Sequence, residues 1–182
     1  MASDTTTHQR ATDLLRQQHE QVKQQLAAVI DAQGAERTEI FDCLRAALAV
    51  HETAEEVVIY PQLRDLGAHD IVDARIAEEH EAKEALAQLE RIGPTTDGFG
   101  PKLLTFTQAV LKHARAEEAT VFPLLESSCD DALLRELGET IERAEELAPT
   151  HPHPHGPSSS LGNMLVGPFA KMVDGVRDKL GH

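Results

Sequence analysis

The chain has few aromatic residues, few cysteines and little positive charge, and each shortage narrows what it can be. Aromatic side chains make up 3% of its 182 residues and tryptophan is absent, so aliphatic side chains must fill the core. Two cysteines in a chain of this length do not make a disulfide framework. With 17 basic against 31 acidic residues the formal charge is −14, which argues against a nucleic-acid partner.

Long apolar runs are missing as well. No apolar stretch approaches about 18 residues, so we expect no segment that spans a membrane. The N-terminal MASDTTTHQR lacks the apolar centre of a signal peptide, which points to a cytoplasmic protein. Ala, Leu, Glu, Gln and Arg, which all favour helix, are abundant, whereas runs rich in β-branched residues between turn signals are absent. The composition therefore predicts an all-α protein.

Apolar residues recur at three- and four-residue spacing through four long segments, which predicts four amphipathic helices. We expect these helices at about residues 9–32, 36–66, 69–92 and 101–127. A shorter segment, about residues 130–147, predicts a fifth helix. Pro61 falls inside the second segment and should kink or locally end that helix. Long helices joined by short loops predict an up-down-up-down four-helix bundle within residues 9–147.

The segments outside the bundle carry further predictions. Residues 1–8 should be a disordered N-terminus, and residues 148–163 a linker rich in Pro, His and Ser. Three histidines alternate with prolines in this linker: His151, His153 and His155. Such an exposed tract can bind metal loosely. Residues 164–182 predict a short amphipathic helix that packs on the bundle or on a second subunit.

Two segments of equal length repeat each other inside the bundle. HETAEEVVIYP, residues 51–61, and HARAEEATVFP, residues 113–123, share a His, two Glu and a final Pro at matching places. A single histidine precedes each segment: His19 lies 32 residues before the first segment's histidine, and His80 lies 33 before the second's. The chain is therefore interpreted as two α-hairpins, each carrying a His and then His-x-x-x-Glu.

Six of these side chains fall on the apolar stripes of the four helices. They are His19, His51, Glu55, His80, His113 and Glu117. Buried imidazoles and carboxylates are costly without partners, and bound metal would compensate that cost. A carboxylate from each half can bridge two ions, so the approximate two-fold repeat favours two metals about 3.5–4 Å apart. Mixed nitrogen and oxygen ligands point to iron, with manganese or zinc as alternatives.

This set of motifs resembles the hemerythrin-like, or HHE cation-binding, domains. Their pattern is His, then His-x-x-x-Glu, then the same again, and the aromatic-Pro ending of EEVVIYP and EEATVFP is typical of them too. The resemblance covers about residues 9–147 and implies a bundle that holds two non-haem iron ions, bridged by an oxo or hydroxo group. The ligands that it implies are His19, His51, Glu55, His80, His113 and Glu117. Of these, the two glutamates would be the bridging carboxylates.

The chain departs from the oxygen-carrying hemerythrins, which have a second histidine on the third helix. Four residues to either side of His80 stand Ile76 and Glu84, so that ligand is missing. Glu52 is the first candidate to replace it, because it lies about 60° from Glu55 at the edge of the core face. Glu84 and water are the other candidates. A carboxylate in this place favours ferric iron, and with it redox chemistry or sensing over reversible oxygen carriage.

Three neighbouring side chains are not expected to bind metal. Glu56 and Glu118 lie about 140° from their histidines on an ideal helix, which points them to solvent or to a supporting role. Tyr60 lies about 180° from His51 and is left out of the site, unless the kink at Pro61 changes its direction.

Three functions suit such a centre. The first is binding or sensing of O₂, NO or peroxide, the second is an enzyme that decomposes peroxide or NO, and iron handling ranks third. We expect a small diatomic or peroxide ligand as the partner, and a monomer or a dimer. The sequence leaves the choice between binding and turnover open.

Overall fold

The structure of the chain, a computed structural model, describes residues 8–147. Every regular element among them is a helix, which confirms the all-α prediction. No helix in this part of the chain is both long and apolar enough to cross a membrane. The predicted linker with its three histidines, and the helix predicted at residues 164–182, lie outside the described residues, as do residues 1–7.

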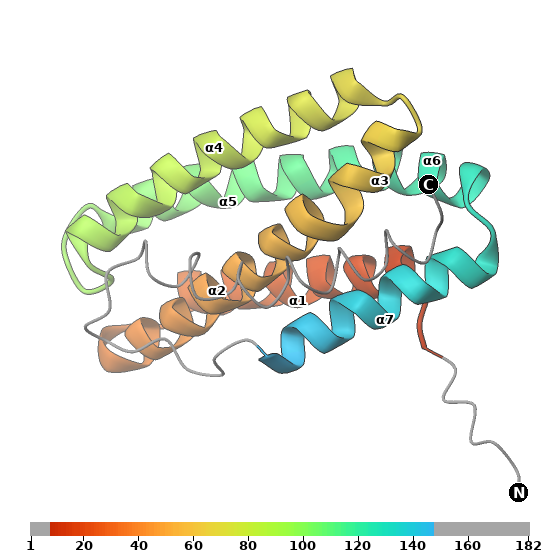
Figure 1. Cartoon of the computed structure of the whole chain (residues 1–182). Coiled ribbons are helices and arrows are strands. Elements are labelled where there is room, and N and C mark those ends of the chain that lie inside the picture. Colours follow the sequence, from red (N-terminus) through yellow and green to blue (C-terminus); the bar gives the residue numbers. More distant parts are fainter. Residues whose placement is uncertain (1–7, 148–182) are drawn as a thin grey trace, which may run out of the picture.

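Two α-hairpins form the bundle (Figure 1). In the first, α1 (Ala11–Asp31) packs along α2 (Gly34–Ala54). In the second, α4 (His69–Ile92) packs along α5 (Phe99–Ala116). The hairpins meet through α1 and α5, whereas α2 and α4 approach each other far less closely. This is the predicted four-helix bundle.

The second helix of each hairpin passes through a π-helical turn inside the repeated motif. α2 continues as η1 (Glu55–Ile59) and then as α3 (Tyr60–Asp65). α5 continues in the same way as η2 (Glu117–Val121) and then as α6 (Phe122–Ser128). A proline is the second residue of both α3 and α6. Because proline lacks an N–H and clashes with the preceding turn, the wider π turn lets the helix continue where Pro61 was expected to kink or end it.

The predicted fifth helix, α7 (Asp131–Leu147), lies along α1 and contacts η1 (Figure 1). Its first turn is capped because the Asp130 carboxylate accepts a hydrogen bond from the Leu133 backbone N–H at 2.8 Å. Leu134, Leu137 and Ile141 bury the apolar face of α7 against the bundle. α7 therefore covers the side of the first hairpin that carries the π turn.

Buried apolar side chains form two clusters, separated along the bundle. One includes Leu15 and the apolar face of α7, and the other includes Val22 and Leu48. His19 lies between Leu15 and Val22 on α1, and His51 follows Leu48 on α2. The polar side chains of the repeat thus lie where the two clusters meet, with apolar residues on both sides.

Candidate metal centre

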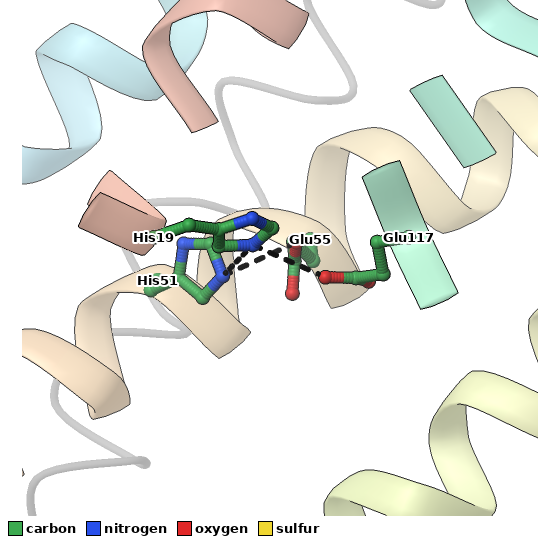
Figure 2. Close-up of side chains that lie close together, drawn as sticks. All are labelled: His19, His51, Glu55 and Glu117. Atoms are coloured by element: carbon green, nitrogen blue, oxygen red, sulfur yellow. Dashed lines mark hydrogen bonds and ion pairs between the residues drawn. The ribbon is translucent and has the colours of Figure 1, made fainter. Parts of the chain in front are cut away.

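Five of the six side chains that the repeat singled out meet in the middle of the bundle. They are His19, His51, Glu55, His113 and Glu117, and all are buried. Figure 2 shows four of them pointing toward one another from α1, α2, η1 and η2. The two halves of the sequence repeat thus contribute corresponding His and Glu side chains to the same place in the bundle.

The sixth side chain, His80, does not join them. Its side chain is 73% exposed and its Nε2 lies 3.4 Å from an oxygen of Glu84, which is also exposed. The preceding residue, Glu79, is buried instead, with 1% of its surface exposed. Neighbouring residues on a helix point about 100° apart, so only one of the two can face the core. The prediction that His80 points into the interior is wrong, and Glu79 occupies that place.

The buried donors fall into two groups that could each hold a cation. The four-residue group is His19, His51, Glu55 and Glu117, and the three-residue group is Glu55, Glu79 and His113. Within each group the donor atoms all lie within 4.8 Å of one another. Because Glu55 belongs to both, its two oxygens can face two ions at once.

A neighbouring side chain fixes the tautomer of each buried histidine. The Nδ1 atoms of His19, His51 and His113 contact oxygens of Glu118, Gln18 and Glu78 at 2.9, 2.7 and 3.3 Å. An oxygen acceptor at Nδ1 holds the ring proton there, which leaves the Nε2 lone pair for a cation. Glu118 therefore supports the site by orienting His19, which is one of the two alternatives predicted for it.

These contacts also explain why Glu79 takes the place of His80. In the first hairpin Gln18 contacts a histidine 33 residues later, and the next residue, His19, enters the cluster. In the second hairpin Glu78 contacts a histidine 35 residues later, and the next residue, Glu79, enters the three-residue group. Glu78 thus corresponds to Gln18, and Glu79 corresponds to His19. The contact spans 33 residues in the first hairpin and 35 in the second. Because of this difference, the residue that corresponds to His19 is Glu79 and not His80.

The spacing of the donor atoms fits a cation between them. The Nε2 atoms of His19 and His51 lie 3.2 Å apart. His51 Nε2 lies 3.3 Å from Glu55, and the Nε2 atoms of His19 and His113 lie 3.3 and 3.4 Å from Glu117. Adjacent ligands with metal bonds of about 2.1 Å are separated by about 3.0–3.4 Å. Two imidazole lone pairs facing each other at this distance need a positive charge beside them.

Several of these atoms are buried without any hydrogen bond in the described part of the chain. They are both carboxylate oxygens of Glu55, Oε2 of Glu117 and Nε2 of His113. Such atoms cost free energy unless a partner compensates them. The residues present therefore fit a metal ion, and the orphaned atoms are the ones that face it.

Burial and mutual repulsion separate the protonation states of the cluster. Burial, followed by the charge of Glu117, raises the pKa of Glu55 well above its usual range. Burial also raises the pKa of Glu117, but the nearby imidazoles of His19, His113 and His51 outweigh it, so the net pKa is lowered. Burial, with the neighbouring imidazole of His19, lowers the pKa of His51 to about 3. A metal-free centre therefore keeps a proton on Glu55 that a cation would displace.

Tyr60 is a member of the site that the sequence prediction left out. Its hydroxyl shares its one proton between Glu79 and, at 3.1 Å, Glu117. The π turn before Tyr60 changes its direction relative to His51, so the ideal-helix angle did not apply. The aromatic residue before Pro61 was the available signal. Phe122, its counterpart in the second repeat, stacks on the His19 ring with centroids 5.5 Å apart.

A cavity adjoins both groups between the helices. Its lining residues are His19, Val22, Leu48, His51, Glu52, Glu79, Ala82, Val110, Leu111, His113 and Ala114. Glu52 lies in this wall and pairs with Lys83 Nζ at 3.4 Å, outside the two donor groups. Burial raises the pKa of Glu52 to about 7 and that of Glu79 to about 8. Apart from Glu52, the cavity thus has aliphatic walls, with a polar end at the metal-binding groups.

The chain belongs to the hemerythrin HHE cation-binding domain family, whose profile matches residues 10–125. A hemerythrin-like protein of Schizosaccharomyces pombe, described as uncharacterized, is 27% identical over 136 residues, or 73% of this chain and 67% of that protein. A protein of Nostoc sp. named DNA nickase is 26% identical over 117 residues, which are 64% of this chain but only 33% of the nickase.

The fold is also that of a solved member of the family. The crystal structure of a hemerythrin HHE cation-binding domain-containing protein from Mycobacterium kansasii is similar with a TM-score of 0.70. It is 27% identical, and the match covers 76% of this chain and 86% of that chain. The family resemblance of the repeated motif is therefore confirmed, and with it a hemerythrin-like domain with a His/Glu cluster for metal cations.

Proposed function

We propose that the two donor groups hold a non-haem di-iron centre with Glu55 shared between the ions. Glu117 supports this proposal as a second bridge, because its Oε2 lies near His19 of one group and His113 of the other. Glu79 replaces His80 in the predicted ligand set, and Glu52 stays a candidate for a further ligand from the cavity wall. Two adjacent iron ions supply redox-active binding positions for O₂, NO or peroxide.

Binding or sensing of O₂, NO or peroxide is the function that the site supports best. The observation that carries it is the cavity with aliphatic walls that ends at His51, Glu79 and His113. Most of the lining beside the two donor groups is aliphatic, which suits small neutral molecules. We propose a monomer or dimer acting inside the cytoplasm, with a small diatomic or peroxide ligand as its partner.

A second candidate is an enzyme that decomposes peroxide or NO, and Tyr60 favours it. Its hydroxyl is buried between Glu79 and Glu117, where it can hold or donate a proton beside the metal-binding groups. Burial and the surrounding carboxylates raise the pKa of this phenol, so it stays protonated at neutral pH. Iron handling ranks below both functions.

One experiment separates these functions. The full chain is loaded with iron without oxygen, its visible spectrum is recorded, and O₂, NO and peroxide are added in turn. Stable adducts without turnover are the result expected for binding or sensing. Rapid O₂ release from peroxide that Tyr60→Phe slows would favour the enzyme. A protein that takes up no iron, or a His51→Ala variant that takes up as much as wild type, would overturn both.

A further inference from the structure

We infer that the two donor groups bind metal with different strength and selectivity. The four-residue group takes the first ion tightly, whereas the three-residue group takes the second ion more weakly and discriminates less against Mn(II). This inference rests on the proposed dinuclear centre, because it concerns the order and the metals with which that centre is filled.

The ligand atoms of the two groups differ in kind. The four-residue group offers two imidazole nitrogens, from His19 and His51, beside two carboxylates. The three-residue group offers one imidazole, from His113, beside the carboxylates of Glu55 and Glu79. Imidazole favours the later transition metals, while carboxylates suit Mn(II) and similar hard cations. The preference for Co(II) over Mn(II) should therefore be smaller in the three-residue group.

The two groups also differ in the partners that their carboxylate oxygens already have. Glu55 is common to both groups, so the difference lies between Glu117 and Glu79. Oε2 of Glu117 is buried without a hydrogen-bond partner among the described residues and is open to a cation. Both oxygens of Glu79 are engaged, one by the Tyr60 hydroxyl and the other by Lys83 Nζ at 3.5 Å. A cation that binds Glu79 must share or displace these partners, which weakens its binding.

Lys83 is fixed in this competing position by two further carboxylates. Its Nζ lies 2.6 Å from Glu56 and 3.4 Å from Glu52, which come from η1 and α2. The ammonium group thus joins α4 to the opposite hairpin. A positive charge 3.5 Å from Glu79 repels a second cation at that carboxylate. No such cation contacts the carboxylates of the four-residue group, among the ion pairs of the described residues.

The test uses the full chain freed of metal and titrated without oxygen. Co(II) is followed by its visible absorption and by calorimetry, and Mn(II) by electron paramagnetic resonance. We expect two Co(II) steps whose dissociation constants differ by at least about tenfold. Mn(II) should compete for the second step at concentrations that leave the first unchanged. Two equal Co(II) steps, or Mn(II) competition of the same strength at both, would overturn the inference.

Two variants assign the steps to residues. Glu79→His supplies the missing nitrogen, so the second Co(II) step should tighten at least about tenfold and Mn(II) should compete less well. Glu81→His adds an exposed histidine to the same helix and should change neither step. Lys83→Met removes the competing charge and should tighten the second step alone. If the Glu79→His and Lys83→Met variants both leave the second step unchanged, the inference is wrong.

These outcomes are separable from failure of the proposed function. A protein that binds no Co(II), or whose binding survives His51→Ala unchanged, contradicts the dinuclear centre itself. A protein that binds two ions equally well keeps that centre and loses only the inequality of its halves.

Discussion

At the scale of single residues, the three buried imidazoles each hold a proton on Nδ1 and present Nε2 to the cluster. His19→Ala removes one Nε2 from the four-residue group, so the iron-loaded protein should lose at least one ion, as measured by elemental analysis. His80→Ala is the matched control, because that side chain is 73% exposed. Equal iron content in both variants would contradict the assignment of His19, and a loss confined to His80→Ala would restore the original prediction.

Tyr60 leads to a second prediction at this scale. Tyr60→Phe leaves two buried carboxyl groups, Glu79 and Glu117, without their shared donor. Since an unsatisfied buried polar group costs about 1–3 kcal/mol, the metal-free variant should unfold with a free energy lower by about that amount. Urea denaturation followed by circular dichroism measures the difference. An unchanged free energy of unfolding would show that the hydroxyl does not stabilise these carboxyl groups.

The sequence repeat identified most of the buried donors. It failed at the third helix, where a shift of one residue decides which side chain faces the core. His80 and Glu79 are neighbours, and the spacing of 33 residues to His113 resembled the spacing of 32 in the first hairpin. The pairing of Gln18 and Glu78 with histidines sets the true register, and no sequence pattern displays that contact. The predicted role of Glu52 as an extra ligand stays a prediction.

At the scale of elements, the π turns carry a prediction of their own. Deleting Val57 would shorten η1 by the residue that widens it, and would turn Tyr60 and Leu63 by about 100° relative to Glu55. Leu63 is fully buried, so its loss from the core should cost about 2–5 kcal/mol. Thermal unfolding should therefore occur at a clearly lower temperature than in wild type.

A deletion of Thr95 is the control for that variant. Thr95 is exposed in the connection between α4 and α5, so its loss should be tolerated far better. If both deletions lower the unfolding temperature equally, the π turn has no special part in orienting α3.

The helices themselves could be predicted well because their apolar spacing is regular. The third helix, expected at residues 69–92, has the same bounds in α4. The second was expected to kink or locally end at Pro61 and the fourth to run through residues 101–127, and each instead contains a π turn before its proline. A change from α to π hydrogen bonding leaves the apolar spacing almost intact, so periodicity alone does not reveal it.

At the scale of the whole molecule, the bundle holds a few of its acidic side chains where water screens them little, and pH should therefore affect its stability. Burial raises the folded-state pKa of Glu52 to about 7 and of Glu79 to about 8. A carboxyl group whose folded-state pKa is raised contributes stability that is lost as the pH rises through that value. The metal-free protein should thus lose about 2 kcal/mol between about pH 6.5 and 8.

The pKa values of His19 and His51 explain why the pH range begins at about 6.5. Burial lowers the pKa of His19, but the neighbouring carboxylates of Glu117 and Glu118 outweigh it, so the net pKa is raised and its contribution also fades as the pH rises. His51, with a pKa of about 3, acts the other way only below about pH 6.5, where its unfolded form takes up a proton. Urea unfolding at the two pH values, with and without metal, measures the effect. Metal-free stability that rises across the window would contradict these assignments.

The central claim is that the core of this bundle holds two metal ions that share Glu55. Crystals of the iron-loaded full chain, measured on both sides of the iron absorption edge, test it most directly. Two anomalous peaks are expected, one among His19, His51, Glu55 and Glu117 and the other among Glu55, Glu79 and His113. A core without any anomalous peak, or a peak bound by His80 instead of Glu79, would contradict it.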